Sequence, residues 1–283
     1  PSASYFKAKK AEQEARHLKH NSTDHNLEPN VKSSPGGLRD LQVLGWVAKQ
    51  HFQVTSFADL KEIGFLTAND LKLIQASQAY LWQVRYALHL LTGKAEERLL
   101  FNYQQDLAQL FGYTTTNANL GVELLMKNYF RQVTRLSELT QLLMQQLEEI
   151  IFPAPTTASQ PLNPRFKLVN GYLHTQSPQV FANQPSALIE VFSLLAANPQ
   201  IKGVGVATIR QLRDNRHLVN QRLRNNPQAK DYFLQVLTSP NQVALQLERM
   251  SRYGILGRFI PEFGQAVGLT QQDLFHIYTV ETH

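Results

Sequence analysis

The chain has 283 residues, of which 43% are hydrophobic and 18% are charged, and its formal net charge is +6. This composition suits a folded protein of one large or two ordinary domains, and the absence of cysteine excludes disulfides, thiolate metal sites and cysteine nucleophiles. No uninterrupted apolar run is long enough to cross a bilayer. We therefore expect a cytoplasmic protein without a membrane span. Because neither an initiator Met nor a signal peptide opens the sequence, we also expect a piece of a longer chain.

Helical patterns fill the first half of the chain. The predicted helices cover residues 3–20, 38–48, 57–65, 68–91, 103–111 and 119–152. The first is strongly charged, and a polar, proline-punctuated loop over residues 21–35 separates it from the second. The fourth helix starts at an approximate capping box opened by Thr67 and stops at Gly93, a residue that commonly ends helices.

The second half begins with the clearest linker of the chain, over residues 153–164, which are rich in proline, threonine, serine and alanine. Asn170 and Gly171 then stand between two short apolar runs, a pattern that predicts a tight β-hairpin. Further helices are predicted over residues 187–197, 207–223, 231–237 and 242–253. The fold class that follows is all-α, in two helical parts with one small β-hairpin between them.

A turn with two glycines precedes the helix that starts at Leu38. Gly36 and Gly37 can take backbone angles that other residues avoid, and Arg39 and Asp40 follow them directly. The start of a helix leaves amide groups free, and such a start attracts anions. The pattern indicates a loop that faces phosphate. The plainer alternative is a turn that only starts the helix, and two glycines by themselves favour that alternative.

Several motifs occur along the chain in the order in which a known family has them. They lie at residues 28–42, 45–49, 64–67, 81–89, 98–101, 254–264 and 273–280. Together they resemble the bifunctional uridylyltransferase/uridylyl-removing enzymes of bacterial nitrogen signalling, the PII protein uridylyltransferases. A looser form of the first motif occurs in the related glutamine synthetase adenylyltransferases. The resemblance covers nearly the whole chain and is weakest between residues 153 and 197.

The resemblance implies a parent enzyme that attaches a uridylyl group from UTP to a tyrosine of the PII signal protein and removes it by hydrolysis. Mg²⁺ or Mn²⁺ would serve both reactions, and glutamine would act as effector through domains outside this chain. The Gly-Ser and Asp-x-Asp motifs of the family's transferase core are missing from this sequence. We therefore expect a central fragment that is inactive alone and binds no metal tightly.

The same resemblance divides the chain into four parts. Residues 1–30 are expected to be the helical tail of the nucleotidyltransferase domain, and residues 31–152 a helical uridylyltransferase-associated domain. Residues 153–184 are the linker with its small hairpin. Residues 185–283 are expected to be the first helices of an HD-type phosphohydrolase domain.

Three sets of candidate site residues follow. The candidates for nucleotide binding are Lys32, Gly36, Gly37, Arg39 and Asp40, with the alternative that Asp40 holds Arg39 in place. Arg85 and His89 share a helix face and form either a packed polar contact or a substrate-facing pair. His283 stands where the HD-type domain has its first metal ligand, but no His-Asp dipeptide accompanies it, so that metal site is incomplete here.

Two other functions compete with the enzymatic one. The chain could be a helical interaction or regulatory module without chemistry, since it contains no full catalytic set. It could also bind nucleic acid through the arginines of the predicted helix over residues 207–223. No nucleic-acid-binding motif appears, however, and aromatic residues do not alternate with those arginines, so nucleic acid is the less favoured partner.

Overall fold

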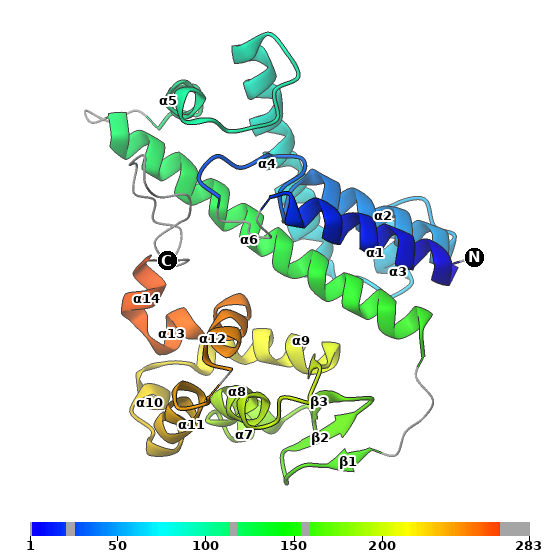
Figure 1. Cartoon of the computed structure of the whole chain (residues 1–283), viewed down its shortest axis with the longest axis vertical. Helices are drawn as coiled ribbons and strands as arrows, with labels where there is room; N and C mark the ends of the chain where they lie inside the picture. The colour runs from blue at the N-terminus through cyan, green and yellow to red at the C-terminus, as the bar shows by residue number, and fades with distance from the viewer. Residues whose placement is uncertain (1, 21–25, 114–117, 154–158, 241, 267–283) are drawn as a thin grey trace. The chain divides into compact units, whose positions relative to one another are not determined.

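The computed structural model describes residues 2–20, 26–113, 118–153, 159–240 and 242–266. It divides into two compact units, which we call unit 1 (within Pro1–Phe152) and unit 2 (Pro153–Gln265). The chain is mainly helical with a small sheet, which confirms the all-α class with a small β-hairpin predicted from the sequence (Figure 1). None of the described helices is both long and apolar enough to span a membrane.

Unit 1 is a helical bundle built along one long helix. Its elements are α1 (Ser2–Leu18), α2 (Leu38–Phe52), α3 (Phe57–Glu62), α4 (Ala68–Thr92), α5 (Phe101–Leu110) and α6 (Ala118–Ile151). The 34 residues of α6 form a rod about 51 Å long. This helix packs against α1, α2, α4 and α5, so nearly every element of the unit buries its apolar face on the same surface (Figure 1).

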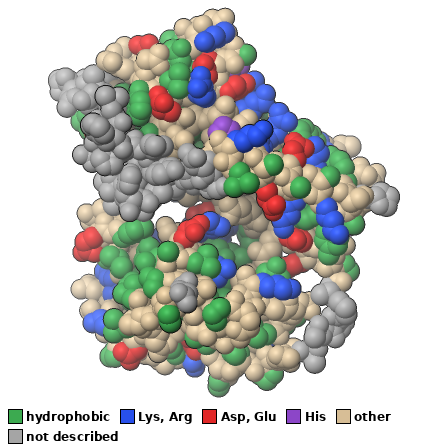
Figure 2. Space-filling view, viewed as in Figure 1, with side chains coloured by type: hydrophobic (Ala, Val, Ile, Leu, Met, Phe, Trp, Pro, Cys, Tyr) green, Lys and Arg blue, Asp and Glu red, His purple; other side chains and the backbone are tan. Residues whose placement is uncertain are grey.

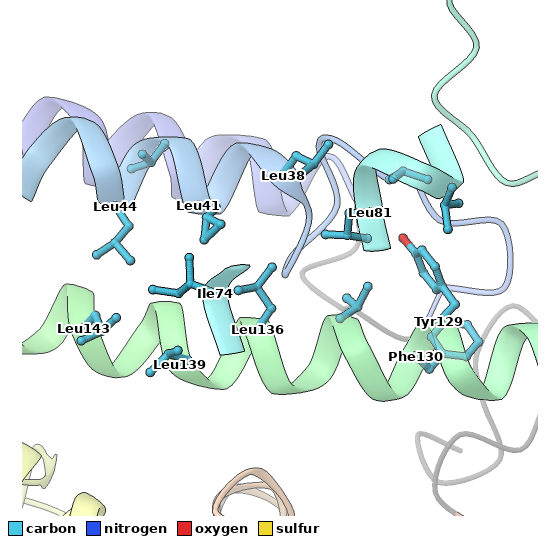
Figure 3. Packing of buried hydrophobic residues seen from close by; sticks show 14 of the residues in the cluster. Leu38, Leu41, Leu44, Ile74, Leu81, Tyr129, Phe130, Leu136, Leu139 and Leu143 are labelled. Atoms are coloured by element: carbon cyan, nitrogen blue, oxygen red, sulfur yellow. The ribbon is translucent and has the colours of Figure 1, made fainter. Parts of the chain in front are cut away.

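The core of unit 1 lies between α2, α4 and α6. Figure 3 shows leucines of α2 and α6 in the space between these helices, with Ile74 and Leu81 contributed by α4. The labelled side chains are all buried, and the largest of them are Tyr129 and Phe130 of α6. Burial of each such side chain stabilises the fold by about 1.5–3 kcal/mol before the entropy cost of folding is subtracted.

Local capping chemistry sets the helix ends of unit 1. Thr67 accepts a hydrogen bond from the Asp70 amide, and the Asp70 carboxylate accepts one in return from the Thr67 amide, as the predicted capping box requires. Ser56 and Asp59 form a second box at the start of α3. Gly93 ends α4 in the left-handed conformation, as predicted.

The charged first helix is firmly packed, although the sequence alone gave it few apolar residues. Phe6 of α1 is 1% exposed, and its ring meets the ring of Phe152 edge-on at 5.8 Å between centroids. α1 lies alongside α2 (Figure 1). A few well-placed apolar contacts and the ion pairs described below therefore hold this helix on the bundle.

Unit 2 combines a small sheet with short helices. Its strands are β1 (Gln160–Pro161), β2 (Phe166–Val169), β3 (Tyr172–Thr175) and β4 (Gly203–Val204), in that order across the sheet. Its helices are α7 (Val180–Asn183), α8 (Ala187–Ala197), α9 (Val206–Asn215), the 3-10 helix η1 (Arg216–Leu218), α10 (Gln221–Arg224), α11 (Pro227–Leu237), α12 (Val243–Arg252), α13 (Leu256–Phe259) and α14 (Pro261–Ala266). The apolar helix α8 lies at the centre and packs on α7, α11 and α12.

The predicted hairpin is present between β2 and β3. Asn170 and Gly171 take φ angles of +56° and +84°, as a two-residue turn with both central residues left-handed requires, and Val169 pairs with Tyr172. The sheet is larger than the hairpin alone, because β1 adds antiparallel to β2 and β4 adds parallel to β3.

The single helix predicted over residues 207–223 is wrong. α9 ends at Asn215, η1 follows, and a new helix, α10, begins after Asn220. The Asn220 side chain accepts hydrogen bonds from the amides of Arg222 and Leu223, which caps the new helix. The chain therefore turns where the apolar spacing suggested continuity.

Candidate functional site

The loop before α2 is a closed turn with its own polar partners. The Asn30 side chain accepts hydrogen bonds from the amides of Lys32 at 3.1 Å and Ser33 at 2.7 Å. The Ser34 hydroxyl, in a residue that is 2% exposed, accepts one from the Asn30 amide. Such side-chain bonds fix a loop in one conformation, because they replace the water that would otherwise solvate its backbone.

The two glycines of this loop are needed for close packing. Gly36 is buried with φ at +73°, and a Cβ atom on it would lie 2.6 Å from the carbonyl oxygen of Val133 on α6. A Cβ on Gly37 would lie 2.8 Å from the carbonyl oxygen of Val31. Any side chain at either position would displace backbone atoms, so the glycines let the loop sit directly against α6 and against itself.

The amides at the start of α2 all have acceptors within the protein. Gly36 donates to the Asp40 carboxylate at 2.7 Å, and Gly37 donates to the Ser34 carbonyl at 2.9 Å. The next two amides donate to carbonyl groups of the loop, that of Arg39 to Lys32 at 2.8 Å. These groups are not free to hold an anion in this conformation, which favours the plainer interpretation of the glycine turn. Any phosphate contact would come from the side chains.

Asp40 is the centre of a buried ion-pair cluster. Its side chain is 2% exposed and accepts hydrogen bonds from Arg16 at 2.8 Å, His17 at 2.9 Å and Gln13 at 3.0 Å, all on α1. Burial raises the pKa of this carboxyl, but the hydrogen bond and charge of His17 and the charge of Arg16 outweigh burial and hold the pKa below its usual value. Asp40 therefore ties α1 to the loop and to α2.

Arg39 lies in a different environment from its neighbour. Its guanidinium group lies over the Trp46 ring at 5.6 Å from the centroid, and the Lys9 ammonium lies over the same ring at 4.9 Å. The Asp40 carboxylate accepts hydrogen bonds from α1 and from the Gly36 amide, and no ion pair joins it to Arg39 among the described residues.

A second polar cluster adjoins the same loop. Glu97 accepts two hydrogen bonds from Arg85, at 2.8 and 2.7 Å, and the Lys32 and His89 nitrogens each lie 3.9 Å from the carboxylate. Burial raises the pKa of Glu97, but the Arg85 bond and the surrounding positive charges hold it below its usual value. On the face in Figure 2, basic and acidic side chains are interspersed over unit 1.

Backbone contacts join this second cluster to the loop. The Val31 amide donates to the Glu97 carbonyl at 2.8 Å, and Asn30 and Arg98 form an antiparallel bridge. Arg85 makes a packed polar contact with Glu97, whereas Nε2 of His89 lies 3.9 Å from the same carboxylate and is buried without a hydrogen bond to a described residue. Sequence reasoning found Lys32, Arg85 and His89 but missed Glu97, because its partners come from a distant helix and loop.

Comparison with known proteins places the chain in a family. A family model described as GlnD PII-uridylyltransferase matches residues 4–144, and one described as the third domain of the uridylyltransferase GlnD matches residues 166–259. The chain belongs to the GlnD PII-uridylyltransferase family. This agrees with the resemblance identified from the sequence motifs.

Curated relatives of this family match the chain from end to end. The bifunctional uridylyltransferase/uridylyl-removing enzymes of Pseudomonas aeruginosa (strain LESB58) and Azotobacter vinelandii (strain DJ / ATCC BAA-1303) are each 48% identical to it over 284 residues. The corresponding enzyme of Pseudomonas syringae pv. tomato is 47% identical over 283 residues. The alignments cover 100% of this chain and 32% of each relative, so the chain spans about a third of their length. No solved structure matches.

The described residues of this GlnD-family chain do not fit a divalent metal site. No group of three or more histidine, aspartate or glutamate side chains is placed to hold an ion within those residues. Asp40 and Glu97 are instead neutralised by cationic side chains, which compete with a metal for the carboxylate oxygens. His283, the metal ligand that the resemblance implies, lies outside the described residues. No step of a reaction can therefore be derived through a metal here.

Proposed function

We propose that the chain is the helical central part of an enzyme that attaches uridylyl groups from UTP to the PII signal protein and removes them by hydrolysis. The observation that carries the proposal is 48% identity over the whole chain to enzymes named for both reactions. In this proposal glutamine acts through domains outside the chain, His283 is a ligand of the Mg²⁺ or Mn²⁺ ion of the removing site, and the enzyme works in the cytoplasm.

The role we propose for unit 1 is to hold nucleotide phosphates with two side chains. The Lys32 side chain is 33% exposed, and its ammonium group lies 3.9 Å from the Glu97 carboxylate. Arg39 is fixed to the same loop, because its amide donates a hydrogen bond to the Lys32 carbonyl. Asp40 and the two glycines would fix the shape of the loop and would not touch the ligand. Lys32 on this loop and Arg39 in the first turn of α2 are each restrained by a neighbour, Glu97 and Trp46, so less side-chain entropy is lost when they bind a triphosphate.

A domain exchange tests the function. The 283 residues would replace the matching third of the Pseudomonas aeruginosa relative, and the chimera would be incubated with labelled UTP, PII protein and Mg²⁺. We expect label to appear on PII and to be released by the same chimera. The isolated chain should do neither, because both reactions need a complete metal site. A folded chimera without either activity, or an isolated chain that transfers label, would contradict the proposal.

Single variants of the chimera test the loop. Arg39→Ala or Lys32→Ala should weaken UTP binding by about 1.5–3 kcal/mol, the size of a charge-assisted hydrogen bond. Lys94→Ala is the matched control for Lys32, because Lys94 lies at the same 3.9 Å from its own partner, Glu96. Unchanged UTP affinity together with a lower melting temperature would show that the two residues are only structural.

A second candidate function, a helical interaction module, is favoured by the outer face of α4. Trp82, Tyr86 and Leu90 are 55%, 67% and 63% exposed and lie at successive turns of the helix, so they form one apolar stripe. Aromatic side chains at such positions commonly anchor protein interfaces. We propose that the PII protein, which the family description names, binds this stripe of α4.

Binding measurements on the isolated chain test this second function. Titration with PII should show binding that Trp82→Ala weakens about tenfold, the effect of losing an aromatic anchor at an interface. Leu234→Ala in unit 2 is the matched control, because Leu234 has a similar exposed fraction of 55%. Equal loss in both variants, or no binding by the wild-type chain, would reject the stripe as the contact surface.

A further inference from the structure

Two arginines of unit 2, Arg216 and Arg258, approach the turn at Gly254, and a third, Arg224, bonds the backbone of Arg258. The position that a Cβ atom on Gly254 would occupy lies 3.1 Å from Nη1 of Arg216 and 3.8 Å from Nη1 of Arg258. Arg224 donates from Nη1 to the Arg258 carbonyl at 3.2 Å, and Arg258 donates from Nη1 to the Gly254 carbonyl at 3.2 Å. Backbone carbonyls thus hold two of the guanidinium groups in place.

The break after α9 creates this arrangement. Arg216 opens η1 and Arg224 ends α10, while Arg258 belongs to α13, more than thirty residues further along the chain. Gly254 has φ at +72°, so the turn before α13 uses a conformation that favours glycine. The missing side chain leaves open the point on which the Arg216 and Arg258 guanidinium groups converge.

Within the described ranges, no acidic side chain forms an ion pair with Arg216, Arg224 or Arg258 at this turn. Elsewhere in the molecule arginines are paired with carboxylates, as Arg85 is with Glu97 and Arg165 with Glu190. Burial, and then the charge of Arg216, lower the pKa of Arg258, which reflects the cost of holding like charges together.

We propose that Arg216, Arg224 and Arg258 form a binding site for a phosphate group. Guanidinium groups donate paired hydrogen bonds that match phosphate oxygens, and a dianion relieves the repulsion between neighbouring cations better than a single carboxylate does. The ligand is either inorganic phosphate or the phosphate of a nucleoside monophosphate, which share this chemistry. The site is independent of the nucleotide loop of unit 1, because it rests on different residues in the other unit.

Calorimetric titration of the whole chain tests the site. Inorganic phosphate and uridine monophosphate would be titrated separately at constant ionic strength, with potassium chloride as the reference. We expect saturable binding of phosphate, weakened about tenfold by Arg216→Gln, the usual effect of losing one charge-assisted hydrogen bond. Tighter binding of the monophosphate would identify a nucleotide as the ligand, and equal binding would identify the phosphate group alone; either supports the site.

The matched control is Arg222→Gln. Arg222 is an exposed arginine on α10, only two residues from Arg224, so this variant removes the same charge from the same surface without touching the turn. It should bind phosphate as the wild type does. The proposal is overturned if phosphate gives no more heat than chloride, or if Arg222→Gln weakens binding as much as Arg216→Gln. The Arg216 side chain is exposed and makes no hydrogen bond to the described residues, so the variant should fold normally; a circular dichroism spectrum verifies this.

Discussion

Each unit contains a buried carboxylate that is paired with an arginine, but the two carboxylates accept hydrogen bonds from different sets of donors. Asp40 in unit 1 is 2% exposed and Glu190 in unit 2 is 3% exposed. Asp40 is surrounded by Arg16, His17, a side-chain amide and a backbone amide. Glu190 takes two hydrogen bonds from Arg165 and one from Asn163. Asp40 therefore has several donors that can replace one another, whereas Glu190 depends on a single cation.

The largest expected effect is the loss of that single cation. Arg165→Met should lower the free energy of unfolding of unit 2 by about 3 kcal/mol, because it leaves Glu190 buried without a countercharge. Urea unfolding monitored by circular dichroism measures the change. Arg249→Met is a control on the same unit, since the side-chain hydrogen bonds of Arg249 to described residues are long, at 3.4 Å. A loss below about 1 kcal/mol for Arg165→Met would mean that the remaining polar neighbours suffice.

A smaller effect is expected for the corresponding change in unit 1. Arg16→Met should cost about 1.5 kcal/mol, since His17, Gln13 and the Gly36 amide still donate to Asp40. Lys10→Met is the control on the same helix, where the ion pair with Glu148 is more than a third exposed on both sides. If Arg16→Met lowers the free energy of unfolding as much as Arg165→Met does, the remaining donors do not stabilise the Asp40 carboxylate, and the contrast between the two units is wrong.

The smallest effect concerns acid stability. Folding lowers the pKa of Asp40, so its contribution to stability is complete above the ordinary value near 4 and is lost as pH falls through the lowered value. Asp40→Asn should therefore be less stable than the wild type at pH 6, and the difference should be smaller at pH 3. Urea midpoints at both pH values test this. If the difference in stability between the wild type and Asp40→Asn is the same at both pH values, the charge of Asp40 does not stabilise the fold.

Local signals in the sequence predicted the local structure. The box at Thr67 and the turn at Asn170 were recognisable because each depends on residues only one to three positions apart. The break at residues 216–220 was not, because Ile209, Leu212, Val219 and Leu223 are all buried and keep helical spacing on either side of it. A periodic pattern reports which residues are buried and does not report whether the backbone stays continuous.

The candidate site was only partly predictable for a related reason. The loop residues Lys32, Arg39 and Asp40 were found from their motif, but the partners that define them come from elsewhere. Arg16 and His17 reach Asp40 from the preceding helix, and Glu97 reaches Lys32 from a loop beyond α4. Such ion pairs form only when the helices pack together, so no local pattern in the sequence indicates them. Whether Lys32 and Arg39 bind nucleotide stays a prediction.

The long helix α6 has a consequence for how unit 1 is made. It comes last in the unit, yet the loop at Gly36 and helices α1, α2, α4 and α5 all pack on it. During synthesis the helices that precede α6 therefore leave the ribosome without the surface on which they bury their apolar faces. Folding of this unit must wait until α6 has emerged, and the earlier helices need protection from aggregation for that interval.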